Sequence, residues 1–217
     1  MSEYVVEIQA VVNAALNELS QEHQSGKLAD APIANNHFLI RWVTRAIKTQ
    51  RFHHCVAKDL IAWQKIGRSK GNQAGFWELF KRISLLYGEV LGKDNTDILD
   101  SDIESFLDRM EGLDWEVSTS EPLTNCGKTQ LFTDGQKSLG LCANQCDDCF
   151  DGAVLVKPMS FFVRGNHAEF VDQAYQAGFL LHKVTDYKSS VKYHGEYVLF
   201  PSNKGKQLAE LPNSLCM

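Results

Sequence analysis

Three cysteines in the second half of the chain lie close enough together to bind one metal ion. Cys142, Cys146 and Cys149 fall within eight residues, and polar side chains such as Asp147 and Asp148 separate them. Zinc and iron–sulfur sites need several thiolates that converge on one point. Buried core cysteines would have apolar neighbours instead. The pattern therefore indicates metal ligands.

A fourth ligand is predicted from a hairpin beside this cluster. Residues 128–133 and 138–143 alternate like two strands joined by a turn. If they pair, Cys126 lies opposite Gln145 and beside Cys146, at the ~5 to 8 Å that separates neighbours on paired strands. Zinc is favoured over an iron–sulfur cluster, and a protein without a metal is the remaining alternative. The predicted ligands are Cys126, Cys142, Cys146 and Cys149.

Other interpretations of the cysteines have less support. The spacing of Cys142, Cys146 and Cys149 also resembles the cluster-binding motif of radical S-adenosylmethionine enzymes. However, Asp148 stands where those enzymes usually have an aromatic residue, and the motif lies late in the chain. A lone nucleophile, such as Cys55 beside His54 or Cys216 beside His194, is not favoured over burial by any spacing.

A run of basic residues in the first half is the second chemical signal. Between positions 41 and 82 the chain holds ten cations and two carboxylates, whereas the remainder holds 12 cations and 25 anions. Three of the cations fall within ~60° of each other on a helical wheel, opposite an apolar face. Two more lie in the segment 67–71, which is predicted to be a loop. These five predicted contact residues are Arg41, Arg45, Lys48, Arg68 and Lys70.

Cations presented in this way predict a partner of opposite charge. They could neutralise successive phosphates of a nucleic acid, contact an acidic protein, or face the acidic half of the same chain. An ordinary solvated helix face is the plain alternative. His53 and His54 are adjacent and point to different faces, so a joint metal role is not expected.

The composition and the absence of common catalytic motifs narrow the range of function classes further. The chain has 217 residues, of which 44% are hydrophobic, enough for one large domain or two small ones. No segment approaches the ~20 apolar residues of a membrane helix, and no export signal opens the chain, so we expect a cytoplasmic protein with reduced cysteines. Walker, Gly-x-Ser-x-Gly and His-Glu-x-x-His motifs are absent, so a binding protein is expected more than an enzyme.

Helices must position the basic residues. Apolar residues recur at helical spacing in five segments of the first half. Asn35 or Asn36 is predicted to cap the second helix, Gly67 to end the third, and the box Ser101–Glu104 to cap the fifth before Gly112. The predicted helices cover 2–26, 35–48, 54–65, 76–91 and 101–111.

Strands must position the cysteines, because the second half alternates with period two and is rich in β-branched and aromatic residues. Besides the hairpin, strands are predicted at 115–119, 159–163, 179–184 and 196–200, with a helix capped by Asn166 and stopped at Gly178. We therefore predict an α+β protein. A helical subdomain, residues 1–113, packs with a mostly antiparallel sheet that carries one or two helices, residues 114–217.

Four stretches of the sequence stand out together: residues 34–44, 63–71, 142–152 and 183–188. They resemble an uncharacterised bacterial family, Domain of Unknown Function 2913. The resemblance implies a bacterial, cytoplasmic protein and offers no catalytic residues to transfer. Our leading hypothesis is a non-enzymatic, zinc-stabilised protein that contacts nucleic acid or an acidic partner through basic helices. An iron–sulfur redox or sensor protein and a metal-free interaction module are the alternatives.

Overall fold

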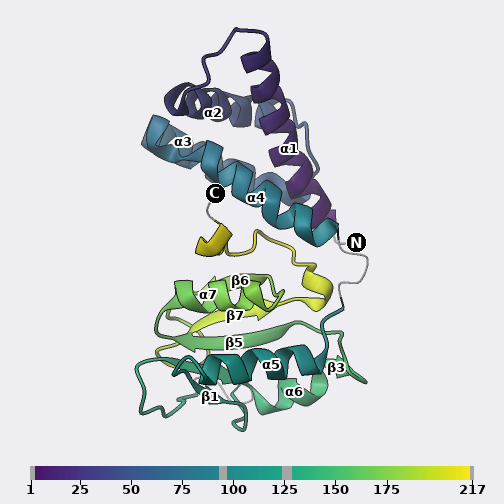
Figure 1. The fold of residues 1–217 in the computed structure, drawn as a ribbon, viewed down its shortest axis with the longest axis vertical. Coiled ribbons are helices and arrows are strands. Elements are labelled where there is room, and N and C mark those ends of the chain that lie inside the picture. Colours follow the sequence, from purple (N-terminus) through teal and green to yellow (C-terminus); the bar gives the residue numbers. More distant parts are fainter. Residues whose placement is uncertain (1–2, 93–96, 124–128, 216–217) are drawn as a thin grey trace. The chain divides into compact units, whose positions relative to one another are not determined.

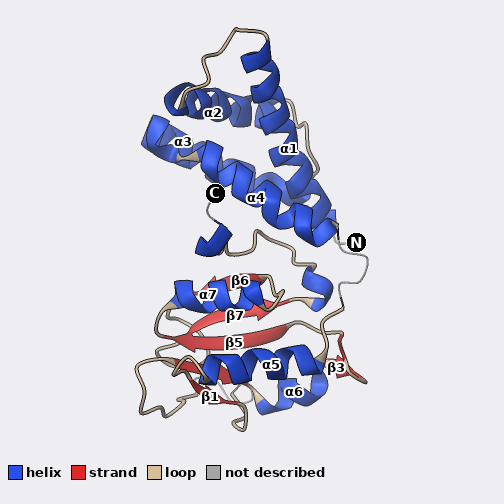
Figure 2. Cartoon of the chain, viewed as in Figure 1, coloured by secondary structure: helices blue, strands red, loops and turns tan. Residues whose placement is uncertain are grey.

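The computed structural model describes residues 3–92, 97–123 and 129–215, and the chain divides into two compact units (Figure 1). The first unit is helical, and the second combines a sheet with helices, as the secondary structure in Figure 2 shows. The predicted α+β class is thus confirmed. The first unit comprises Met1–Lys93 with Lys206–Leu208, and the second comprises Asp94–Gly205 with Ala209–Met217.

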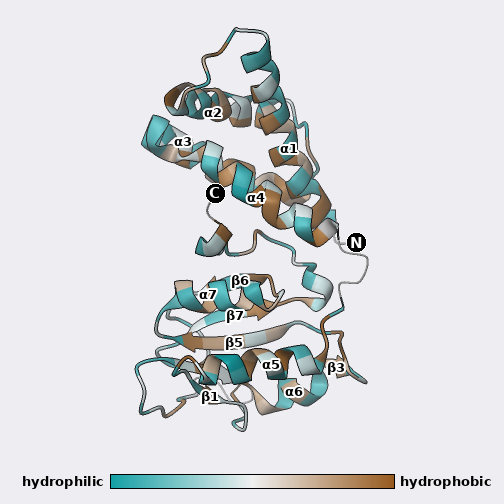
Figure 3. Cartoon of the chain, viewed as in Figure 1, coloured by the Kyte–Doolittle hydropathy of each residue, from teal (hydrophilic) through white to brown (hydrophobic). Residues whose placement is uncertain are grey.

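Four α-helices build the first unit because each has one apolar side. Figure 3 shows hydrophobic positions recurring between hydrophilic ones along the last of them. The first helix packs on the fourth and the second on the third, around Trp42, Trp63 and Phe80. The elements are α1 (Glu3–Gln24), α2 (Pro32–Lys48), the 3₁₀ turn η1 (His54–Val56), α3 (Ala57–Lys70), the 3₁₀ turn η2 (Gly71–Ala74) and α4 (Phe76–Leu91).

Helix α2 begins earlier than predicted, at Pro32, which suits the first turn because that position needs no N–H donor. Asn35 and Asn36 therefore lie inside the helix, where both are buried. The Asn36 side chain accepts a hydrogen bond from the Trp77 backbone N–H at 3.2 Å and so links α2 to the start of α4. The cap prediction was wrong, because the helix already begins at Pro32 and the Asn35 amide instead bonds the side chains of His23 and Asp30.

Helix α3 continues through Gly67 to Lys70, so the predicted stop at Gly67 was also wrong. A Cβ atom at this position would lie 3.1 Å from two side-chain carbons of Ile40 and 3.3 Å from the Phe76 ring. Glycine here permits the close approach of α2, α3 and α4. Consequently Arg68 and Lys70 belong to the last turn of a helix, not to a loop.

Substitution Gly67→Val should destabilise the first unit by about 1–3 kcal/mol, because the added side chain overpacks the contact with Ile40. Chemical denaturation measures the change. The matched control is Ser69→Val, an exposed position of the same helix, for which a change within about 0.5 kcal/mol is expected. Equal effects of the two substitutions would contradict this account of the helix contact.

The second unit is built on a five-stranded sheet of order β1-β2-β5-β7-β6. β1 and β2 pair in parallel, and the other neighbours pair antiparallel. A separate two-stranded sheet joins β3 (Phe150–Asp151) to β4 (Val154–Leu155). The large sheet comprises β1 (Glu116–Ser118), β2 (Ser138–Leu141), β5 (Met159–Arg164), β6 (Leu181–Thr185) and β7 (Gly195–Leu199), and the helices are α5 (Asp100–Glu111), α6 (Ala143–Asp148) and α7 (His167–Gln176).

Most strands of this unit agree with the sequence prediction, and so does α7, where the Asn166 side chain accepts a hydrogen bond from the Glu169 N–H at 3.2 Å. Helix α5 belongs to this unit although the sequence placed it in the first subdomain. The reason is that Phe106 and Met110 pack with the core of the sheet. The helix starts at Asp100, before the predicted box, and the Asp102 carboxylate accepts the Leu99 N–H at 2.9 Å.

The predicted hairpin of 128–133 with 138–143 was wrong. β2 pairs instead with β1 and β5, Ser138 lying opposite both Glu116 and Arg164. Every residue of β2 is buried, so this strand sits inside the sheet and needs a partner on each side. The register that placed Cys126 beside Cys146 therefore loses its basis, and Cys126 itself lies outside the described residues.

The two faces of the sheet carry different cores. On one face, α5 and α7 cover an aromatic cluster that includes Phe106, Phe161 and Phe170, with ring centroids 6.0–6.1 Å apart. On the other face, residues from loops pack on Phe162 of β5. Leu123 and Leu131 lie against Gly140 so closely that a Cβ there would come within 3.2 Å of both.

Candidate functional site

The three clustered cysteines pack in two different cores, although their thiols still interact electrostatically. Cys142 is buried in the loop-covered core with Phe162, whereas Cys149 is buried in the helix-covered core with Phe161. Cys146, in α6, is half-buried and packs against the same core as Cys149. The alternation of side chains along β2 explains the separation, since Leu141 points to one face and the next residue to the other.

This arrangement does not bring the three thiols together as one ligand set within the ranges that the structure covers. Burial raises the pKa of the Cys146 and Cys149 thiols, so both are neutral at pH 7 in the protein without a metal. The Cys149 thiol donates a hydrogen bond to the Pro158 carbonyl, with sulfur and oxygen 3.5 Å apart. The four-cysteine zinc site, which also needs Cys126, stays a prediction.

Thiol labelling should follow this burial. In chelator-treated native protein, an alkylating reagent should modify the half-buried Cys55 and Cys146 well before Cys142 and Cys149, because the latter two must first be uncovered. Mass spectrometry of timed samples assigns the modification to each residue, and denatured protein provides the control in which the four react alike. Early labelling of Cys149 in native protein would contradict its place in the core.

The predicted basic residues are exposed on two helices that pack together. Arg41, Arg45 and Lys48 lie on the outer side of α2, opposite the buried Leu39 and Val43. The exposed cations of α3 are Lys58, Lys65, Arg68 and Lys70.

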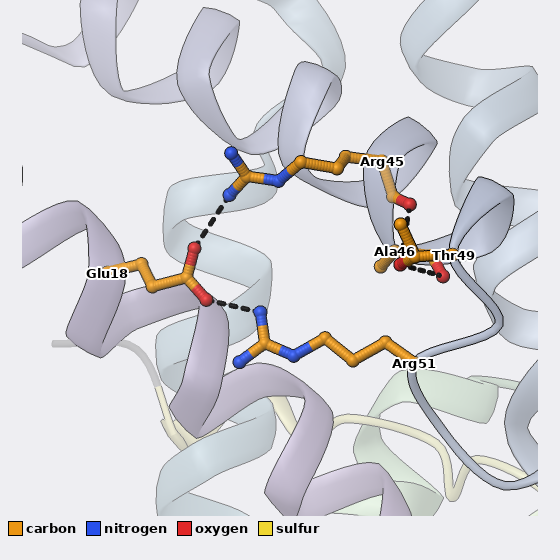
Figure 4. Close-up of polar contacts among 5 residues, drawn as sticks. All are labelled: Glu18, Arg45, Ala46, Thr49 and Arg51. Atoms are coloured by element: carbon orange, nitrogen blue, oxygen red, sulfur yellow. Dashed lines mark hydrogen bonds and ion pairs between the residues drawn. The ribbon is translucent and has the colours of Figure 1, made fainter.

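Arg45 differs from its neighbours because an ion pair holds it (Figure 4). Its Nη2 lies 2.7 Å from Oε2 of Glu18 in α1, and Arg51 binds the other oxygen of the same carboxylate. The Arg51 guanidinium also lies 5.5 Å from the centre of the Trp42 ring. Glu18 thus joins α1 to the C-terminal end of α2 across a groove of about 590 Å³.

The two guanidiniums stabilise the charged form of Glu18. Burial by itself would raise the pKa of this carboxyl group, but the hydrogen bond from Arg51 and the charges of Arg51 and Arg45 outweigh burial and lower it. A carboxyl group whose pKa is lower in the folded than in the unfolded state stabilises the fold above the unfolded pKa. That stabilisation disappears as the pH falls through the folded pKa.

Substitution Glu18→Gln should therefore cost about 0.5–1 kcal/mol at neutral pH, the scale of a partly exposed ion-pair network. The cost should start to decline as the pH falls towards about 4.3, the ordinary pKa of a glutamate, and should vanish only below the lowered pKa of Glu18 in the folded protein. Denaturation at a series of pH values measures this. Glu22→Gln, in the same groove and without an ion pair among the described residues, is the control and should lower the stability less at neutral pH.

Six other cations have no such partner. Within residues 3–92, the exposed lysines and arginines of α2 and α3 other than Arg45 form no ion pair, and three carboxylates of the same unit have other partners. Glu18 binds two arginines, Glu3 lies 3.2 Å from His53, and Asp59 accepts a hydrogen bond from Tyr4 at 3.0 Å. We call the six the unpaired cations: Arg41, Lys48, Lys58, Lys65, Arg68 and Lys70.

Two side-chain clusters were missed by the sequence interpretation, because their members are far apart in the chain. The first contains His53, not His54, together with Cys55 and Glu3.

His194, which the sequence offered as a partner of a nucleophilic cysteine, is buried, and its Nε2 lies 2.9 Å from Ser138 Oγ. Cys216 lies outside the described residues.

The second cluster that the sequence interpretation missed contains His167, Lys183, Tyr197 and Glu210. It lines a pocket of about 280 Å³ beside α7 and β7. His167 Nδ1 lies 2.7 Å from the Tyr197 hydroxyl, and Lys183 Nζ lies 3.1 Å from Asp186 and 3.4 Å from Glu210. Burial lowers the pKa of His167 and raises the pKa of Tyr197 to about 12. At neutral pH the imidazole of His167 and the phenol of Tyr197 are therefore uncharged, and Lys183 is paired with two carboxylates. The pocket thus has a polar lining without an activated nucleophile.

The fold and these surfaces define an α+β protein with a helical unit that presents unpaired cations. Residues 3–212 match the family model described as Protein of unknown function (DUF2913), and the chain therefore belongs to this family. The comparisons found no match among curated proteins or solved structures. No helix in the described ranges is long and apolar enough to cross a membrane.

Proposed function

We propose that the helical unit binds the phosphate backbone of a nucleic acid through the unpaired cations of α2 and α3. The observation that carries this proposal is that these cations form no ion pair within residues 3–92, while Glu18, Glu3 and Asp59 of the same unit have other partners. The fields of neighbouring cations without local counter-charges add together and attract anions to the surface that carries them. Phosphates supply such charges in a regular row.

The spacing of the cations supports a polymeric anion. Arg41 and Lys48 in α2, and Lys58 and Lys65 in α3, are each seven residues apart, or about 10.5 Å along a helix. One strand of DNA advances about 3.4 Å per phosphate along its axis, so each pair spans about three phosphates. Contacts of this kind fix position without reading the base sequence.

The two arginines bound by Glu18 serve a different role in this proposal. They fix α2 against α1 so that the outer side of α2 keeps its cations in place. A zinc ion at the predicted cysteine site would stabilise the second unit and leave this surface unchanged. No catalytic step is needed for the proposed function.

Binding should be strongly salt-dependent. Fluorescence anisotropy with a labelled duplex DNA and a labelled single-stranded RNA should show affinity that falls as salt rises, with a slope of about −0.9 per phosphate contacted on DNA. The variant Arg41→Glu, Lys48→Glu, Arg68→Glu should lose most of this binding. Each lost cation should also reduce the slope by about 1.

The matched control makes the same change of charge on exposed lysines of the second unit: Lys157→Glu, Lys188→Glu, Lys192→Glu. It should bind nearly as well as the wild type. Equal losses in both variants would contradict a specific role for α2 and α3. Lack of binding to either nucleic acid at low salt would overturn the proposal and leave an acidic protein as the partner to test.

A further inference from the structure

Three potential metal ligands meet where α1 begins and where the turn η1 leads into α3. One oxygen of Glu3, one nitrogen of His53 and the sulfur of Cys55 all lie within 4.8 Å of one another. Glu3 Oε1 is 3.2 Å from His53 Nε2. Glu3 lies 50 positions before His53, so the fold, and not a local motif, brings it to the other two ligands.

We propose that Glu3, His53 and Cys55 bind a divalent transition-metal ion of the zinc type. Thiolate, imidazole and carboxylate are the three protein ligands that zinc uses, and a mixed set of this kind selects against the harder calcium and magnesium ions. A thiolate and a carboxylate also balance the two charges of the ion. The Glu3 side chain is 64% exposed and that of His53 35%, so the ion can enter from solvent and a water can complete the coordination.

The surroundings of the sulfur favour a cation. The carboxylates of Glu3, Glu7 and Asp59 all act electrostatically on Cys55. Asp59 is in turn positioned by the hydroxyl of the buried Tyr4, at 3.0 Å. A divalent ion would relieve the repulsion among these negative groups. The hydrogen bond from Tyr4 to Asp59 links α1, which holds Glu3, to α3, which directly follows the turn that holds Cys55.

Binding needs one proton to leave. The Cys55 thiol loses its proton to solvent as sulfur bonds to the metal, while the Glu3 carboxylate is already charged. In the metal-free protein His53 Nδ1 accepts a hydrogen bond from the Cys55 N–H, at 3.4 Å, so the ring proton of the neutral imidazole lies on Nε2. On binding, that proton is lost from Nε2 and one is gained at Nδ1 through solvent, so that Nε2 can donate its electron pair to the ion. The hydrogen bond from the Cys55 N–H and the Nε2–Glu3 contact are then replaced by bonds from His53 and Glu3 to the ion.

Cobalt(II) is the probe, because it takes zinc sites and its absorption spectrum reports thiolate coordination. Added to the metal-free full chain, it should produce a sulfur-to-cobalt band at one ion per chain that zinc displaces. Zinc should raise the melting temperature as a ligand of the folded state. Both effects should disappear in Cys55→Ser, and His53→Ala should weaken binding at least about tenfold, the loss seen even for outer-shell changes.

Three control variants test whether this site, and not another group in the chain, produces the cobalt band. His54→Ala removes an adjacent exposed histidine outside the group, and Glu7→Gln removes a neighbouring carboxylate that is not a ligand, so both should keep the cobalt band. Cys146→Ser should keep it as well. A band that survives Cys55→Ser but is lost in Cys146→Ser would overturn the proposal in favour of the clustered cysteines. Absence of any thiolate band in the wild type would overturn it outright.

Discussion

The helical unit depends on the close approach of three helices at Gly67. Because the residue has no side chain, Ile40 of α2 and Phe76 of α4 can both contact the backbone of α3. A larger residue would push α3 away and change which sides of α2 and α3 face outward. The exposure of the unpaired cations thus follows from a contact on the opposite, buried side of the same helices. The Glu18 carboxylate completes the arrangement by tying α1 to α2.

The sequence predicted the elements well where a single local signal was strong. The helical period of α1 and α4, the Asn166 cap of α7 and the alternation of β6 and β7 each correspond to an element of the structure. The prediction was wrong where a residue serves a distant contact. Asn36 looks like a cap but binds the backbone of α4, and Gly67 looks like a stop but serves helix packing. The strand partners of β2 likewise depend on long-range pairing, which local alternation does not encode.

For the candidate sites, too, the sequence revealed local features but not contacts between distant residues. The cations of α2 were found from the sequence because one helical face is a local property, but the ion pair that distinguishes Arg45 needs Glu18 from another helix. Close spacing of Cys142, Cys146 and Cys149 suggested convergence, yet a strand and a short helix direct these thiols into two cores. Conversely, Glu3, His53 and Cys55 gave no signal, since 50 residues separate the first two.

The unequal cover of the two sheet faces has a consequence for the internal motions of the second unit. Helices α5 and α7 protect one face through a broad aromatic core, whereas loop residues such as Leu131 and Val191 protect the other. Loops detach at lower free energy than packed helices. Amide hydrogens of the covering loops should therefore exchange with solvent through a partial opening that lifts the loops from Phe162, whereas those of α5 and α7 need a more global opening that separates the helices from Phe161. The two covers would then report two distinct levels of stability within one unit.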